Sequence, residues 1–318
     1  MTETINPPMR PPSAAADPDI QEHPVGAPER WGRALLGWVQ EPDLRPLFQA
    51  SAVTSPMSVD DFISEARVRR QARAGLTVNA PGSVTVAELP APLAARADSL
   101  RATEQFRTHY EPFSAQLAVI PLADLVTPQW WVDAEYVDSL AESAPVEEDL
   151  DGMFDFSFSM GRLARPMNIG LNGAAFASAR GDIGGPSPLR VSRYSPEKVT
   201  FEFDVTPRPN WVWVVVSADM NRLFILNGVH HLLALMKAGR QHAYCLVRPA
   251  NSLGDLTANG WNPQNPELFK PQELTGPRPP LLRDYLDQQQ AADVGIHLRQ
   301  CFLRLALQAE VGLIPRVA

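Results

Sequence analysis

The chain has 318 residues, of which 45% are hydrophobic and 20% are charged, and its formal net charge is −8. This is a globular composition, and the length allows one large domain or two smaller ones. The acidic balance argues against an autonomous binder of duplex DNA, which needs a basic face. No apolar run approaches the ~18 residues of a membrane-spanning helix, and the N-terminus has no apolar signal region, so we expect a cytoplasmic protein with no membrane partner.

Cysteine and proline carry little chemistry here. The two cysteines, Cys245 and Cys301, fall on a predicted strand and a predicted helix. Their separation gives neither a disulfide framework nor metal-ligand spacing, which indicates buried thiols in a reducing compartment. The 31 prolines gather at the start of the chain and around 186–209 and 263–280, where they predict loops and linkers.

The first third of the chain predicts a disordered tail over residues 1–28 and a mostly helical extension over 29–110. The apolar run Trp31–Val39 has helical spacing. Ser58 is a suitable N-cap for a helix that Gly75 ends. Four arginines make one side of this helix basic, which indicates either a solvated face or a contact with phosphate or an acidic partner. They are Arg67, Arg69, Arg70 and Arg73.

The middle and the end of the chain give further elements. Residues 116–122 predict a strand, 133–143 an amphipathic helix, and 147–151 an acidic loop. The strict alternation of FDFSFSM, which begins at Phe154, predicts a strand, and residues 190–205 predict two more. After a Pro-rich segment from residue 251, an apolar stripe over 293–310 predicts a closing amphipathic helix.

The most informative segment is 211–249. Its pattern predicts a strand, a turn, a second strand, a turn at Asn227–Gly228, a short helix that begins with His230 and His231, and a last strand after Gly239. A glycine turn that leads into a helix points main-chain N–H groups at any anion placed there. The segment therefore predicts a phosphate or nucleotide site.

Two pieces of the chain, 118–143 (AVIPLADLVTPQWWVDAEYVDSLAES) and 223–247 (LFILNGVHHLLALMKAGRQHAYCLV), together resemble the ParB/sulfiredoxin-like superfamily, in particular its ParB N-terminal domain-like members. The resemblance implies an α+β fold in which helices flank a small mixed sheet. It places this domain at 111–250, with an insertion at 147–205, between N-terminal and C-terminal helical extensions, the latter over 251–318.

The resemblance also assigns the residues of the corner. Asn227 stands where the family has Asp, Gly228 matches the turn glycine, and His230 matches the family His. Val229 stands where sulfiredoxins carry their catalytic Cys, which excludes thiol chemistry, and His231 stands where the family has Arg. By resemblance, residues 227–230 hold ATP or CTP with Mg²⁺, and His230 and His231 are the candidate catalytic residues.

Three functions remain open at this point. The first is a nucleotide-binding enzyme that carries out phosphoryl transfer or nucleotide hydrolysis, for which an acidic base or metal ligand is needed. The nearest candidates are Asp124, Glu135, Asp138 and Glu142. The second is a degenerate, non-catalytic interaction or scaffold protein with a protein partner or a second copy of itself. The third, a DNA-associated regulator, is disfavoured because the region after residue 247 lacks a paired-helix pattern.

Overall fold

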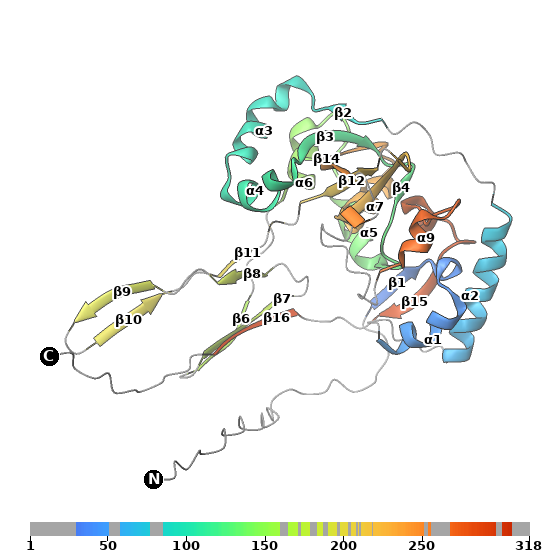
Figure 1. The fold of residues 1–318 in the computed structure, drawn as a ribbon, viewed down its shortest axis with the longest axis horizontal. Helices are drawn as coiled ribbons and strands as arrows, with labels where there is room; N and C mark the ends of the chain where they lie inside the picture. Colours follow the sequence, from blue (N-terminus) through green and yellow to red (C-terminus); the bar gives the residue numbers. More distant parts are fainter. Residues whose placement is uncertain are drawn as a thin grey trace, which may run out of the picture.

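The computed structural model describes residues 30–50, 58–76, 85–159, 211–217, 219–250 and 268–296, together with shorter strands between 165 and 207 and at 301–306. The predicted tail, 1–28, lies outside the described residues. Helices and sheets of mixed orientation combine in an α+β fold, as predicted (Figure 1). Among the helices that the structure describes, none combines the length and apolar character needed to span a bilayer.

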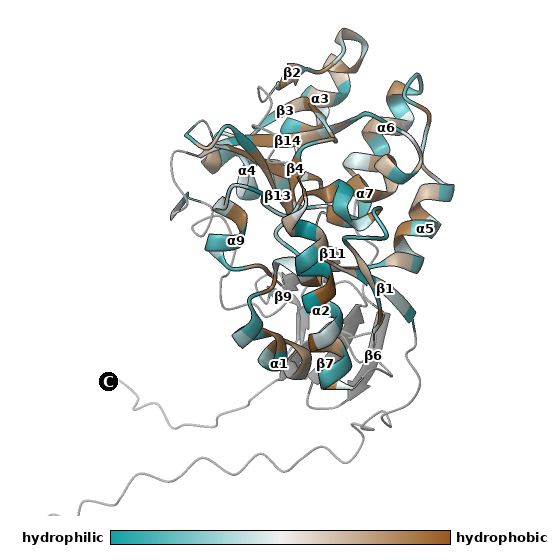
Figure 2. Ribbon diagram, turned by 90° about the vertical axis from the view of Figure 1, so that its right-hand side faces the viewer, coloured by the Kyte–Doolittle hydropathy of each residue, from teal (hydrophilic) through white to brown (hydrophobic). Residues whose placement is uncertain are grey.

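A mixed six-stranded sheet forms the centre of the body, in the order β2-β3-β14-β12-β13-β4. Its strands are β2 (Ala87–Glu88), β3 (Gln116–Pro121), β4 (Leu125–Val126), β12 (Trp213–Ser217), β13 (Arg222–Asn227) and β14 (His242–Ala250). β12 and β13 form an antiparallel hairpin, β14 runs parallel to β12, and β3 pairs antiparallel with β14. The predicted strands at 116–122 and within 211–249 are thereby confirmed, and Figure 2 shows hydrophobic colour along β3, β13 and β14.

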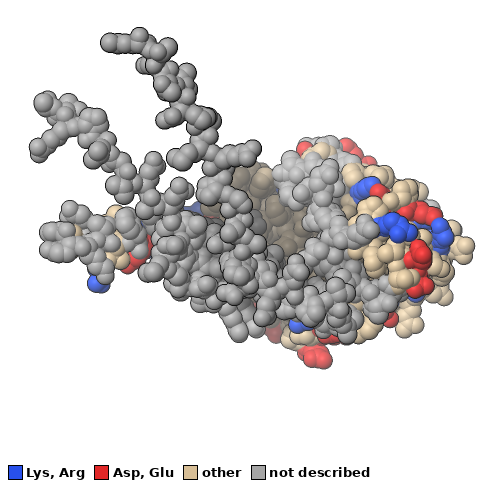
Figure 3. Space-filling model, turned by 90° about the horizontal axis from the view of Figure 1, so that it is seen from below, with Lys and Arg blue, Asp and Glu red and all other residues tan. Residues whose placement is uncertain are grey.

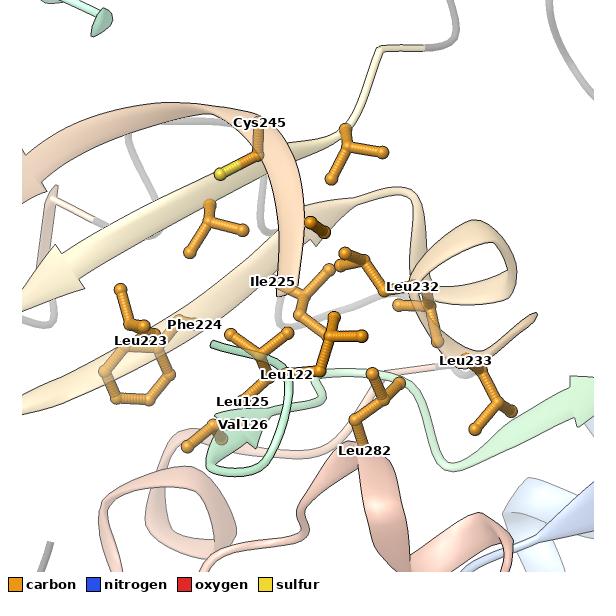
Figure 4. Close-up of a cluster of buried hydrophobic side chains, with 14 of the residues drawn as sticks. Leu122, Leu125, Val126, Leu223, Phe224, Ile225, Leu232, Leu233, Cys245 and Leu282 are labelled. Carbon is orange, nitrogen blue, oxygen red and sulfur yellow. The ribbon is translucent and has the colours of Figure 1, made fainter. Parts of the chain in front are cut away.

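Helix α7 (Val229–Lys237) connects β13 to β14 and buries most of its side chains. Leu232 and Leu233 lie beside Ile225 of β13, Leu125 of β4 and Leu282 in the cluster drawn in Figure 4. Each of these leucines is at most 2% exposed, so the helix is held by packing rather than by intrinsic propensity. This packing fixes the position of the predicted corner.

A second sheet closes over the start of α7 and joins the two ends of the body. β1 (Arg30–Ala34) lies between β15 (Ala292–Ile296) and β5 (Trp131–Asp133), antiparallel to both. The helix predicted for Trp31–Val39 is therefore wrong, because its first half is this strand and only Leu36–Trp38 forms a 3₁₀ turn. Backbone pairing on both sides of β1 outweighs the helical spacing of its apolar residues.

The N-terminal helices follow the sequence signals more closely. α1 spans Glu41–Ala50 and α2 spans Val59–Ala74. Ser58 caps α2 through a reciprocal bond with Asp61, and Gly75 ends the helix, as predicted. Pro90–Tyr110, within the extension, forms a 3₁₀ turn followed by α3 (Ala94–Arg101) and α4 (Glu104–His109).

Two helices lie between β5 and the strands that follow. α5 (Ala134–Glu142) begins at its N-cap Asp133, in agreement with the prediction for 133–143. The strand predicted for FDFSFSM is wrong, because most of this segment belongs to α6 (Leu150–Ser157). Asp149 caps α6 by accepting from the Gly152 N–H, and Phe154 and Phe158, four residues apart, pack with ring centroids 4.8 Å apart. The alternating phenylalanines thus satisfy a helical contact as well.

The C-terminal helix predicted for 293–310, and with it the C-terminal helical extension, is also wrong. The segment forms β15 and then β16 (Cys301–Ala306), so Cys301 begins a strand. Val294 is fully buried where β15 completes the second sheet. Both strands pair with segments more than 100 residues away, and this long-range pairing is invisible to a local helical stripe.

Strands from the predicted insertion lie apart from the body in Figure 1 and are called the arm here. The arm contains a three-stranded sheet, β16-β7-β6, and two two-stranded sheets, β10-β9 and β11-β8. Its members other than β16 are β6 (Arg165–Gly170), β7 (Gly173–Ser178), β8 (Ile183–Pro186), β9 (Arg190–Ser195), β10 (Lys198–Glu202) and β11 (Val205–Pro207). The two strands predicted at 190–205 correspond to β9 and β10.

Candidate functional site

Gly228 forms the bend at the start of α7 for two separate physical reasons. Its φ is +92°, in the left-handed region that side chains other than glycine rarely adopt. A Cβ at this position would also lie 2.9 Å from Cγ2 of Val212. The bend that the sequence predicted is therefore present, and the space beneath it is filled by a valine.

The side chain of Asn227 forms a hydrogen bond within the protein. Its Nδ2 donates to the main-chain oxygen of Trp211 at 2.8 Å, which ties the end of β13 to the chain entering β12. An aspartate at this place has no proton to donate when ionised, and its carboxylate would face a carbonyl oxygen. Asparagine rather than aspartate at this position therefore has a structural reason.

His230 is partly buried and accepts a hydrogen bond through one ring nitrogen. The main-chain N–H of Asp133 donates to its Nε2 at 3.1 Å, and its ring lies 5.5 Å from that of Tyr136. Because the accepting nitrogen carries no proton, this bond specifies the neutral tautomer with its proton on Nδ1. The ring is thus held by the second sheet.

Arg30 is the residue at this corner that sequence reasoning missed. Its Nη1 lies 3.0 Å from Oδ2 of Asp133, whose Oδ1 accepts from the Tyr136 N–H at 2.9 Å and so caps α5. Arg30 is 103 residues from Asp133. Local spacing contains no signal for this approach, which depends on the pairing of β1 with β5.

His231 points to a different environment from His230, as expected for neighbours about 100° apart on a helix. It is 7% exposed, and its ring meets that of Phe156 edge-to-face at a centroid distance of 5.3 Å. An arginine here would place a cation against an aromatic, buried surface, which costs free energy without a paired anion. Val229, the neighbour on the other side of His230, is also buried.

The four acidic candidates do not gather at the corner. Asp124 pairs with Arg283 at 3.4 Å, and Asp138 pairs with Lys237. Glu135 accepts from the main-chain N–H of Trp31 at 3.0 Å. Glu142 is exposed near the end of α5. Within the described part of the chain, no group of three or more acidic, histidine or cysteine residues is arranged to hold a metal ion.

Glu147, from the predicted acidic loop, holds the far end of α7 in place. Its Oε1 accepts from the main-chain N–H of Gln241 at 2.5 Å and of His242 at 3.1 Å. These bonds, that of Gln241 first, lower the pKa of the Glu147 carboxyl. The acidic loop thus positions the turn between α7 and β14.

Two further features of the body are not part of the corner. A cavity of about 440 Å³ lies between α3 and α6 and is lined by neither histidine. Cys245 is fully buried on β14, and burial raises the pKa of its thiol, so the thiol is not a nucleophile at neutral pH.

Comparison of the chain with protein-family models, curated proteins and solved structures finds no match in any of the three.

Proposed function

We propose that this chain is a non-catalytic interaction protein on a ParB/sulfiredoxin-like scaffold. The proposal is supported by Asn227 and His231, the two residues that differ from the family's phosphate motif, because both make contacts inside the protein. Asn227 donates to the Trp211 carbonyl, and His231 packs against Phe156. The family's Asp and Arg would serve a bound phosphate, whereas these two replacements serve the fold.

The state of His230 supports the same proposal. Its Nε2 accepts from the Asp133 main chain, so an imidazolium that attracts phosphate forms only if this bond is given up. The neutral ring keeps one donor, Nδ1–H, where an arginine offers a charged fork. The corner is therefore better suited to holding two sheets together than to stabilising developing charge.

The strands of the arm support a role in association with another protein chain. The sheets β10-β9 and β11-β8 have two strands each, and a two-stranded ribbon is at best marginally stable alone in water. Within the described residues neither sheet has a third strand, and an unpaired strand edge is a template for pairing with another chain. These features support an association in which the arm is covered by a protein partner or by a second copy of this chain.

Hydrogen exchange of the β9 and β10 amides tests the association. In dilute solution of the isolated chain we expect these amides to exchange quickly while those of β12 and β14 stay protected. Protection that grows with protein concentration, together with a larger mass in light scattering, identifies a second copy as the partner. Strong protection in the dilute monomer contradicts the proposal, because the arm then needs no partner.

Nucleotide binding is the second candidate, and it is favoured by the left-handed bend at Gly228 ahead of the nine-residue helix α7. Asn227, Gly228 and His230 are each only partly buried, so a ligand has access to this bend. The first-turn geometry of a helix suits an anion, and ATP or CTP with Mg²⁺ is the ligand this candidate requires.

Thermal unfolding with and without ATP, CTP or GTP, each with Mg²⁺, separates the two candidates. A nucleotide at 100 times its dissociation constant stabilises the folded state by about 2.7 kcal/mol. The interaction proposal predicts no such stabilisation. A stabilisation that His230→Ala abolishes would overturn it in favour of the nucleotide site.

A further inference from the structure

The basic face of α2 divides into paired and unpaired arginines. Arg67 and Arg70 both reach Glu41, at 3.0 Å and 3.2 Å respectively. Arg69 bonds to Glu65 at 2.7 Å. Figure 3 shows red and blue side chains close together at the end of the molecule where α1 and α2 lie, which agrees with this pairing. Three of the four arginines therefore have an ion-pair partner, and two of them share Glu41.

Arg73, in the last turn of α2, is different. Within the part of the chain that the structure describes, its guanidinium makes no hydrogen bond and no ion pair. Its contact is with an aromatic ring, since its Cζ lies 5.6 Å from the ring centroid of Trp38. Trp38 is 1% exposed, whereas Arg73 as a residue is only partly buried, so the guanidinium lies beside a buried indole on a residue that solvent still contacts.

Further cations surround the same indole. The Cζ of Arg278 lies 5.5 Å from the Trp38 ring centroid, and Arg278 is fixed by two bonds to Asp284, at 3.0 Å and 2.6 Å. Burial first, and then repulsion from Arg70 and Arg278, lowers the pKa of Arg73. Within the described residues, Arg70 pairs with Glu41 and Arg278 with Asp284, whereas Arg73 forms no ion pair.

Glu273 is an acidic side chain whose charge acts on Arg73 without an ion pair. Glu273 opposes the lowering of the Arg73 pKa, but the two groups form no ion pair. Glu273 is 6% exposed, and burial raises the pKa of its carboxyl. A half-buried guanidinium with like charges around it gains free energy from an added anion.

We propose that Arg73 is the anchor of an oxyanion site that takes one carboxylate or phosphate group. The Trp38 ring centroid lies 5.6 Å from the Arg73 Cζ, a guanidinium can bond an oxyanion through two N–H groups at once, and Arg278 and Arg70 add favourable charge. The chain's net charge of −8 and the carboxylates on α1 and α2 oppose an extended polyanion, so a single group fits better than a nucleic-acid backbone. This site is separate from the corner at α7 and does not depend on the function proposed there.

A cation in the last turn of a helix also interacts favourably with the helix dipole, and this role requires no ligand. Arginine Nε–Hε resonances in a nitrogen-15 NMR titration distinguish the two roles. At constant ionic strength we expect inorganic phosphate or acetate to shift the Arg73 signal in a saturable manner while chloride does not. Parallel, unsaturated shifts of all exposed arginines would leave only the dipole role and overturn the site.

Matched variants assign the binding to Arg73. Arg67→Gln, on the same helix, removes a paired arginine and should leave the affinity unchanged. Arg73→Gln should abolish the saturable response, and Arg73→Lys should weaken it severalfold, because lysine lacks the planar fork. Equal effects of Arg67→Gln and Arg73→Gln would refute a specific site. Thermal unfolding of each variant checks that the fold is retained.

The source of the oxyanion is distinguished by comparing inorganic phosphate, acetate and a short glutamate-containing peptide. Tighter binding of the peptide than of acetate indicates an acidic side chain presented by a protein, whereas tightest binding of phosphate indicates a free small anion. Either result supports the site. The nucleotide measurements proposed above are repeated on Arg73→Gln, so that a phosphate bound here is not mistaken for one bound at the α7 corner.

Discussion

Replacing Gly228 by alanine tests whether the bend at α7 is a fixed structural feature. The left-handed backbone at φ +92° costs a residue with a Cβ about 1–2 kcal/mol. The added Cβ would also lie 2.9 Å from Cγ2 and 3.1 Å from Cα of Val212, a contact that the neighbouring backbone must move to relieve. Overpacking of this kind costs about 1–3 kcal/mol, so the total loss of unfolding free energy should be about 2–5 kcal/mol.

Gly239 provides the matched control for this substitution. Its φ is +81°, but an added Cβ would meet no heavy atom within 4 Å, so Gly239→Ala should cost only the backbone component. Urea-induced unfolding of the two variants, followed by tryptophan fluorescence, gives the difference. In a double-mutant cycle, Val212→Ala should recover about 1 kcal/mol in the Gly228→Ala background. Equal destabilisation by Gly228→Ala and Gly239→Ala would refute the steric argument.

The remaining predictions concern single contacts. Asp133→Ala should cost about 1–2 kcal/mol through loss of the α5 cap, whereas Asp133→Asn should cost less, and urea unfolding compares them. Main-chain N–H groups lower the pKa of Glu147 from its ordinary 4.5. The stabilisation of the fold by the ionised carboxylate is therefore present above pH 4.5 and is lost as the pH falls through the lower folded pKa. Glu147→Gln should reduce this fall in unfolding free energy at acid pH, measured by urea unfolding across pH. Cys245, with 0% exposure, should react with thiol reagents only at the rate of unfolding, and rapid labelling of Cys245 in the native Cys301→Ser variant would contradict this. Arg278→Met leaves the buried carboxylate of Asp284 unpaired and should cost about 3–5 kcal/mol, measured by urea unfolding, unless Asp284 is replaced as well.

The parts of the fold that the sequence predicted correctly are those specified by local chemistry. Ser58 and Gly75 bracket α2 because capping side chains and the C-terminal glycine act within one turn. The hairpin of β12 and β13, the glycine bend and α7 follow one another without interruption, so their periodicity and turn residues suffice. The α+β class follows from these elements, whereas the ParB/sulfiredoxin-like assignment stays a prediction.

The errors occur where distant backbone pairing decides the structure. Arg30–Ala34 and Ala292–Ile296 lie at opposite ends of the described body and become strands by pairing with each other. Each carries apolar residues at a spacing that also suits a helix, so the local pattern could not discriminate. The strand predicted for FDFSFSM was wrong for the opposite reason. Its alternation suits a strand, whereas the cap at Asp149 and the Phe154–Phe158 contact favour the helix α6.

The candidate site divides in the same way. The glycine bend and the order of Asn227 to His231 were evident in the sequence, but the partners of these side chains were not. Arg30 reaches the corner only through the second sheet, and the isolation of Arg73 is visible only after its neighbours on α2 are seen to be paired. Residue types identify candidate groups, while the free energy available to each depends on partners that only the fold supplies.

Asp133 connects these observations in physical terms. It ends β5, caps α5, pairs with Arg30 of β1, and through its main-chain N–H holds His230 in one tautomer. β1 is in turn paired with β15, so the strand nearest the start of the described body and one near its end together position the imidazole. Any ligand or partner that opens the second sheet therefore releases His230, and any proton added to Nε2 weakens the attachment of that sheet to α7. The corner joins α7, α5 and the second sheet, and Asp133 contributes to all three contacts.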